Sequence, residues 1–219
     1  MTVQELYYEL HLLVNKNNED VKINIEKLHF VTIFNRELDK WLNESLILNN
    51  NSSKITYLQE LLIPNEKLEL LEDRKEYSSY TLPNNFFSVA TVYAICKNEI
   101  CSKNIFAYEI NPKEKNVFLQ DEFSKPSFEW EESIFTISQN KLFFYKENFK
   151  ILDCIISYYS NDFKIDIEGY INLQDKPSEN INCKLSDFYQ REILNRVALE
   201  ISRQFEDINK FQLSKTRIN

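Results

Sequence analysis

The chain has 219 residues, and its 34 aspartates and glutamates against 26 lysines and arginines give a formal charge of −8. With 43% hydrophobic and 14% aromatic residues, it is not a disordered tail and can bury a sizeable core. Its single glycine, Gly169, excludes glycine-rich phosphate loops and the nucleophile elbow of α/β-hydrolases. The only histidines, His11 and His29, exclude an HExxH zinc site and leave little room for a histidine-based triad. Composition therefore argues against an ordinary enzyme.

The first 66 residues predict a helical part. Thr2 and Glu5 have the spacing of a capping box, and the helix that follows is expected to run to about Asn15. A longer helix is predicted from about Asn24 to Leu46. Its apolar stripe consists of Leu28, Val31, Leu38, Trp41 and Leu42. A short third helix is expected to end at Pro64, because proline cannot continue a helix.

Residues 67–172 predict an antiparallel β domain, because the apolar period changes here to two. The segment from Phe86 to Ile95 is apolar at both alternating sets of positions, which is typical of a buried strand. A second strand is expected at Ile105–Ile110. Residues 134–137 and 142–145 predict a hairpin, and Leu152–Tyr158 a further alternating strand. Short strands without long helices between them indicate an antiparallel sheet or a small sandwich.

Residues 173–210 contain a third long helix, from Ser186 to about Asn209, which we expect to pack on the N-terminal helices. Its apolar stripe is Tyr189, Ile193, Val197, Ile201 and Phe205. Periodicity then stops, so residues 211–219 are predicted to be an extended tail. The fold class is therefore α+β, with helices at both ends bracketing an antiparallel sheet or small sandwich.

Three groups of residues are candidates for function. Cys96 and Cys101 lack a second closely spaced pair, so we interpret all four cysteines as reduced thiols in an intracellular compartment rather than zinc ligands. The acidic segment 121–132 could hold a divalent metal, although a solvated loop is the simpler interpretation. Within that segment Trp130 is either a core residue or a candidate interface anchor. No cofactor, metal ligand or catalytic residue is predicted, and no apolar run approaches the ~18 residues that span a bilayer.

Seven short segments, taken in order along the chain, are distinctive: 2–10 (TVQELYYEL), 34–41 (FNRELDKW), 82–86 (LPNNF), 123–131 (FSKPSFEWE), 167–171 (IEGYI), 193–196 (ILNR) and 211–213 (FQL). No single motif is a chemical signature. As an ordered set over most of the chain, they resemble a structural protein family of crAss-like bacteriophages.

The resemblance implies a head-to-tail connector, a ring protein bound under the portal in short-tailed phages. Such rings are generally twelvefold and without catalytic activity, their terminal helices build the ring, and a C-terminal tail reaches toward the portal. The implied partners are other copies of the chain, the portal protein, the next tail or ring protein, and passing double-stranded DNA, without sequence specificity. The implied location is the portal–tail junction of the virion, after synthesis in the host cytoplasm.

We therefore expect a non-enzymatic connector whose portal contacts lie in the tail. The contact residues predicted there are Phe211, Gln212, Leu213, Lys215 and Arg217. Two alternatives stay open at the level of sequence. One is a metal-dependent nuclease-like enzyme that uses the acidic segment, with Glu129 and Glu131 as its carboxylates. The other is a monomeric interaction module, carried as virion cargo or acting in the host.

Overall fold

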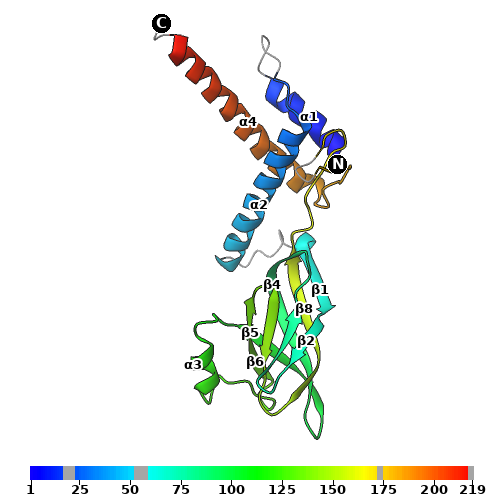
Figure 1. Ribbon diagram of the computed structural model, residues 1–219, viewed down its shortest axis with the longest axis vertical. Helices are drawn as coiled ribbons and strands as arrows, with labels where there is room; N and C mark the ends of the chain where they lie inside the picture. Colours follow the sequence, from blue (N-terminus) through cyan, green and yellow to red (C-terminus); the bar gives the residue numbers. More distant parts are fainter. Residues whose placement is uncertain (17–22, 52–58, 172–174, 217–219) are drawn as a thin grey trace. The chain divides into compact units, whose positions relative to one another are not determined.

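The computed structural model describes residues 1–16, 23–51, 59–171 and 175–216, without the side chains of 46–51 and 206–216. The chain divides into two compact units (Figure 1). The helical unit combines Met1–Glu60 with Asp162–Asn219, and the sheet unit is the continuous stretch Leu61–Asn161. The predicted α+β class with terminal helices is confirmed. The unit boundaries lie at 61 and 161, where the sequence placed 67 and 172.

Three helices form the framework of the helical unit: α1 (Val3–Asn15), α2 (Lys27–Asn51) and α4 (Asp187–Thr216). The predicted capping box is present, since the Thr2 hydroxyl accepts from the Glu5 N–H at 3.2 Å and the Glu5 carboxylate accepts from the Thr2 N–H at 2.7 Å. Most predicted stripe residues are buried, but Leu28 is not. It lies outside the stripe that α2 buries, whose largest members include Phe30 and Phe34.

Helix α4 packs on both N-terminal helices, as the sequence predicted. The Trp41 ring of α2 lies 5.1 Å from the Tyr189 ring of α4, measured between centroids. Ion pairs join the same two helices further along, from Arg196 to Glu44 at 2.7 Å and from Arg36 to Glu200 at 3.0 Å.

The segment after residue 161 belongs to the helical unit rather than to the β domain. Ile165 and Ile167 are buried, and the Asn35 amide of α2 makes two hydrogen bonds to the Ile165 backbone, at 3.0 and 2.9 Å. Lys27 donates to the Glu168 carbonyl at 2.8 Å. The apolar alternation near residue 165 therefore reflects packing against a helix, not a strand of the sheet.

The sheet unit is one eight-stranded sheet with strand order β1-β8-β4-β5-β6-β7-β3-β2. The strands are β1 (Leu62–Lys67), β2 (Glu69–Asp73), β3 (Tyr77–Thr81), β4 (Phe86–Lys97), β5 (Ser102–Glu109), β6 (Glu132–Ser138), β7 (Lys141–Tyr145) and β8 (Lys150–Ser160). Strands β1 and β2 stand at opposite ends of this order, yet only Leu68 separates them in the chain. The sheet must therefore curl until its two edges meet at Leu68, whose N–H donates to the Cys154 carbonyl at 2.9 Å.

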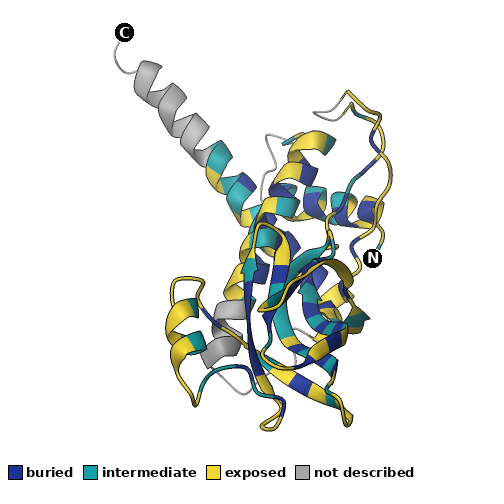
Figure 2. Cartoon of the chain, turned by 60° about the horizontal axis from the view of Figure 1, so that its bottom comes forward, coloured by how far each residue is buried: buried dark blue, intermediate teal, exposed yellow. Residues whose placement is uncertain are grey.

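The inner face of the curled sheet holds one continuous core. Alternate residues of β4 and β8 point into it, Val92, Ala94 and Cys96 from one strand and Cys154, Ile156 and Tyr158 from the other. Figure 2 shows this alternation of buried and more exposed residues along the strands. The predicted β4, β5, β6, β7 and β8 are confirmed, whereas β1, β2 and β3 were not predicted. Leu62, expected in a short helix, lies in β1; residues 57 and 58 of that predicted helix lie outside the described residues.

One pair of neighbouring strands is parallel, β5 with β6, against the prediction of a wholly antiparallel sheet. Parallel neighbours need a crossover connection of a dozen or more residues, and residues 110–131 supply it. This crossover includes the short helix α3 (Lys115–Gln120), fixed to the sheet by Lys115, whose ammonium lies 4.8 Å from the centre of the Tyr145 ring. The acidic segment 121–132 is thus part of the link that makes the parallel pair.

Candidate functional site

The predicted portal-contact segment is not extended in the structure. Phe211, Gln212, Leu213 and Lys215 continue helix α4, which ends at Thr216, while Arg217 lies outside the described residues. The prediction of an extended tail over 211–216 was wrong. A periodic apolar pattern indicates which side of a helix is buried, so its loss does not show that the helix has ended. A helix can continue on its own backbone hydrogen bonds after periodicity has stopped.

An open groove of about 1060 Å³ lies on the helical unit beside α1 and the start of α4. Tyr8 and Leu12, one turn apart on α1, line it with 67% and 55% of their surfaces exposed. On α4 of the same unit Phe188 and Leu199 are also exposed, eleven residues or close to three turns apart, with the polar residues Glu192 and Asn195 between them on that side. We call this side the α4 face. A contiguous exposed apolar pair such as Tyr8 and Leu12 is a candidate protein contact surface, whereas Phe188 and Leu199 are single exposed side chains on a mixed face.

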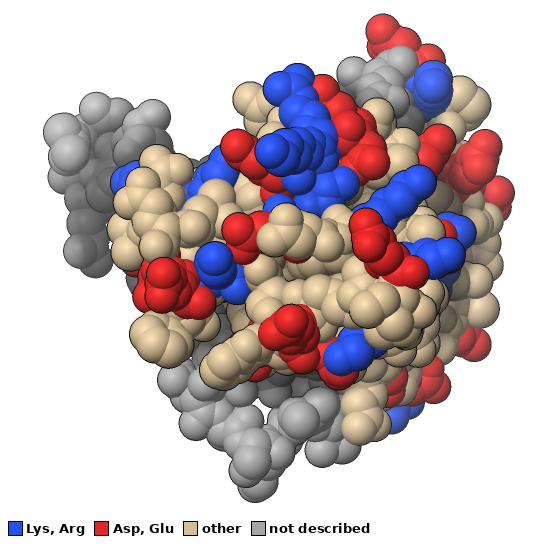
Figure 3. All heavy atoms as spheres, turned by 90° about the horizontal axis from the view of Figure 1, so that it is seen from below, with Lys and Arg blue, Asp and Glu red and all other residues tan. Residues whose placement is uncertain are grey.

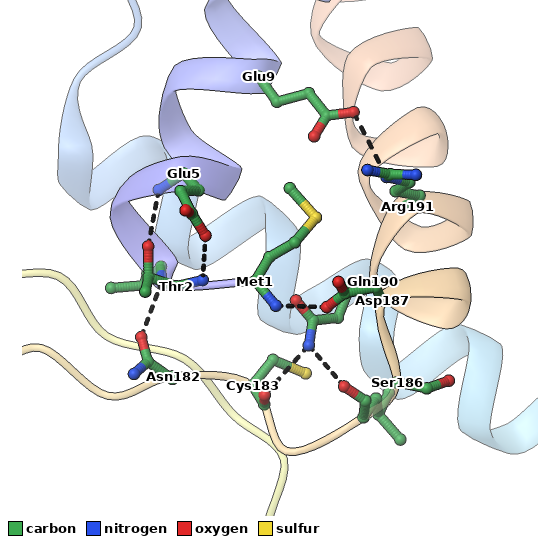
Figure 4. A network of polar contacts seen from close by, with 12 residues as sticks. Met1, Thr2, Glu5, Glu9, Asn182, Cys183, Ser186, Asp187, Gln190 and Arg191 are labelled. Atoms are coloured by element: carbon green, nitrogen blue, oxygen red, sulfur yellow. Dashed lines mark hydrogen bonds and ion pairs between the residues drawn. The ribbon is translucent and has the colours of Figure 1, made fainter.

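A polar network fixes the α1 end of this groove (Figure 4). The Val3 N–H donates to the Asn182 amide oxygen at 2.8 Å, and Arg191 pairs with Glu9 at 3.8 Å. The Met1 ammonium pairs with Asp187 at the start of α4. Hydrogen bonds from the Thr2 N–H and side chain hold the pKa of Glu5 below its usual value, so the cap stays charged. The groove therefore has a polar end joined by hydrogen bonds and ion pairs, and an exposed apolar wall.

Beneath this network Gln190 is buried and only partly satisfied. Its amide nitrogen donates to the carbonyls of Cys183, at 3.2 Å, and Leu185, whereas its side-chain oxygen has no partner in the described structure. The two donated bonds close the turn before α4. Gln190 was not among the predicted residues, since nothing in its sequence context distinguishes it from an exposed helix glutamine.

The structure decides between the two interpretations of Trp130. This residue lies in the crossover segment with 69% of its surface exposed, and Phe123 in the same segment is 83% exposed. Trp130 is therefore not a core residue, and it remains a candidate interface anchor. Trp41, in contrast, is buried on the helix stripe, as the sequence predicted.

The carboxylates of the acidic segment do not converge. Asp121 accepts hydrogen bonds from within its own loop, from Ser124 Oγ at 2.5 Å and from the Phe123 N–H at 3.4 Å. Glu131 pairs with Lys103 at 2.9 Å. Among the residues that the structure describes, no three His, Cys, Asp or Glu side chains come together in a way that could hold a metal ion.

The four cysteines also differ in their exposure to solvent. Cys96, Cys154 and Cys183 are buried and Cys101 is exposed, all as free thiols. Burial raises the pKa of Cys96 to about 12 and raises the pKa values of Cys154 and Cys183 as well. Three of the four thiols therefore stay protonated and behave as small apolar core groups.

Charges of both signs are intermixed on the described surface that Figure 3 shows, with acidic and basic side chains side by side. No described helix contains an apolar stretch of the length that a bilayer crossing requires. A comparison with protein-family models finds no match, and none of the curated proteins matches the chain.

Proposed function

We propose that the protein is a non-enzymatic structural protein of a virion, a head-to-tail connector that forms a ring under the portal and part of the DNA conduit. The proposed location is the portal–tail junction. Two lines support this proposal: the resemblance of the ordered motifs to the connector family of crAss-like phages, and the exposed apolar side chains of the helical unit. The net charge of −8 fits a conduit, because like charge discourages DNA from sticking as it passes.

The observation that carries the proposal is the groove at Tyr8 and Leu12 together with the α4 face at Phe188 and Leu199. A closed ring uses a heterologous contact, in which two different surfaces of each subunit meet. The two candidate surfaces are the groove, lined by α1 and the first turn of α4, and the α4 face that carries Phe188 and Leu199. In the proposed ring the α4 face of one subunit lies in the α1 groove of the next. The C-terminal turns of α4, with Phe211, Gln212, Leu213 and Lys215 followed by Arg217, reach the portal.

Mass photometry of the protein, alone and mixed with the portal protein of the same phage, tests the proposal. We expect a portal-dependent gain of about twelve subunit masses, the closed-ring number that the resemblance implies. Monomers that ignore the portal would contradict it. Deletion of residues 211–219 should abolish portal binding, and unchanged binding would remove the C-terminal contact from the proposal.

Matched variants separate the ring contact from the fold. Leu12→Ser in the groove should prevent the gain in mass, since a polar side chain placed in an apolar contact opposes burial. Ile100→Ser replaces another exposed apolar residue, in the β4–β5 turn, and should leave assembly unchanged. Equal effects of the two substitutions would count against the α1 groove as the ring contact.

A further inference from the structure

A second hollow, of about 400 Å³, lies wholly within the sheet unit. The crossover segment forms most of its wall, and the turns after β4 and before β8 complete it through Asn98 and Asn148. Its apolar lining includes Phe123, Phe128 and Trp130. Phe123 and Trp130 are more than two-thirds exposed, and we call this hollow the aromatic hollow.

The charges around the aromatic hollow are unbalanced. Lys125 and Glu147 in its wall neutralise each other in an ion pair of 3.4 Å. Glu122, Glu129 and Glu132 also line the hollow, and within the described structure their side chains form no ion pair. Three exposed carboxylates without an ion-pair partner thus lie beside two exposed aromatic rings, although Glu129 is close enough to Lys103 to act on its charge.

One lysine ammonium group is already bound in this region by an aromatic ring and a carboxylate. The Lys103 ammonium lies 5.6 Å from the centre of the Phe128 ring and pairs at the same time with Glu131 at 2.9 Å. An aromatic face and a carboxylate together bind one ammonium group, through the ring quadrupole and through charge. Trp130, the better cation–π ring by type, has its own neighbouring carboxylate, Glu129, and no cation over it within the described residues.

From this geometry we infer that the aromatic hollow is a docking site for a basic, extended segment of a partner protein. An arginine or lysine of that segment lies over Trp130 and pairs with Glu129, and further basic residues pair with Glu122 and Glu132. Charge complementarity selects this occupant, because a basic segment is attracted by the excess of carboxylates in the lining and an acidic segment is repelled by it. The inference concerns the sheet unit alone and does not depend on ring formation by the helical unit.

Titration of the full-length protein with a short peptide of alternating Arg and Ser residues tests the inference. Trp130 is an exposed reporter, whereas Trp41 is buried, so binding should change the Trp130 emission and protect it from iodide quenching. Calorimetry provides the dissociation constant, which should rise with added salt as the charges are screened. A matching peptide of Gln and Ser should not bind.

Three variants localise the binding. Trp130→Ala should weaken it about tenfold through the loss of the cation–π and apolar contact. Glu129→Gln should weaken it about threefold, since one partly exposed ion pair is lost. Glu109→Gln is the matched control, an exposed carboxylate on β5 outside the hollow, and should change nothing.

Each contrary result overturns the inference. Absence of binding by the Arg peptide would show that the hollow does not receive a basic segment. Equal binding of the Gln peptide would show that charge does not select the occupant. Equal weakening by Glu109→Gln and Glu129→Gln would show only general attraction to an acidic protein. None of these outcomes bears on portal-dependent assembly, which tests the proposed function separately.

Discussion

The two units of the molecule are built from the chain in opposite ways. The sheet unit is one uninterrupted stretch, residues 61–161, and its inner residues form a single cluster from Leu68 to Tyr158. The helical unit joins residues 1–60 to residues 162–219, so α1 and α2 pack against a helix that begins more than a hundred residues later. One unit is local in sequence and the other depends on bringing the two ends of the chain together.

This difference bears on how the stability of the chain is distributed between its two units. The curled sheet is closed by its own strands, and its core is complete without the helices. The helices are held by contacts between chain ends, such as the Trp41–Tyr189 ring pair and the Arg196–Glu44 ion pair. We therefore expect the sheet to fold autonomously and the helical unit to require both of its segments.

The largest effect is expected when the two units are produced as separate fragments of the chain. A fragment of residues 61–161 should melt cooperatively and keep a near-ultraviolet circular dichroism signal, because all strands of the sheet and its core lie within it. A fragment of residues 1–60 should lack a fixed fold, since the α4 surface that covers its apolar stripes is missing. A non-cooperative sheet fragment, or a stably folded fragment of residues 1–60, would break the comparison.

A core substitution should have the next largest effect. Phe144 on β7 is completely buried in the sheet core, so Phe144→Ala should lower the free energy of unfolding by about 3–5 kcal/mol. Urea unfolding should give the same loss in the full chain and in the fragment of residues 61–161. Phe106→Ala is the control on β5, where the side chain is 54% exposed, and its cost should be far smaller. Unequal losses in chain and fragment would show that the sheet core depends on the helices.

An ion pair in the sheet unit predicts a pH dependence of stability. The Lys146 side chain is nearly buried and pairs with Asp73, which also accepts from Ser78 Oγ at 2.6 Å. These bonds, Lys146 first, lower the pKa of Asp73 from its ordinary value of 3.8. A lowered folded-state pKa means that the stabilisation is present above pH 3.8 and is lost as the pH falls through the lower, folded value.

Asp73→Asn should therefore lower the free energy of unfolding by about 1–2 kcal/mol at neutral pH, a modest value because the carboxylate is partly exposed. The gap between variant and wild type should close in acid as the wild-type carboxylate protonates. Urea unfolding across this pH range measures both. The exposed Glu69→Gln on β2 should show no such convergence, and a pH-independent loss in Asp73→Asn would contradict the assignment.

The smallest effect is expected at the helix cap. Thr2→Ala removes the hydroxyl that accepts from the Glu5 N–H and should destabilise the helical unit by about 1 kcal/mol. Thr2→Ser retains the acceptor and should behave like the wild type. Thermal unfolding followed by a helix signal should move, while the transition of the sheet core should not. A parallel shift of both transitions would indicate that the units unfold together.

The sequence predicted those elements whose apolar residues recur at the spacing of a buried face. The hairpin of β6 and β7 was predicted because alternating apolar residues flank a short polar turn, and its register places Phe135 opposite Phe144. Strands β1 to β3 were missed because they carry little such alternation. Every residue of β2 is exposed, and Pro64 in β1 suggested a helix end, although proline is tolerated at the unpaired side of an edge strand.

Turns were difficult to predict because the chain has one glycine. Gly169 has a φ of 111°, a backbone conformation in which a side chain is strained, so this position favours glycine. Elsewhere asparagine adopts the left-handed conformation, at Asn65, Asn140 and Asn148, as its short polar side chain permits.

The candidate surfaces were only partly predictable. Trp130 was identified by residue type, but its exposure depends on the crossover that the parallel β5–β6 pair requires. That pairing joins positions distant in sequence, and no local pattern specifies it. The groove at Tyr8 and Leu12 was not predicted either, since an apolar residue beside a helix stripe gives no sign of whether a neighbour covers it.

The strands that begin and end the sheet unit lie side by side, with Leu62 of β1 paired to Tyr159 of β8. Tension applied between the two ends of this unit therefore acts at one end of an antiparallel pair. In that geometry the hydrogen bonds of β1 and β8 run along the pulling direction and carry the load one after another. We therefore expect the β1–β8 pair to separate one hydrogen bond at a time under force, starting where the chain enters and leaves the sheet unit.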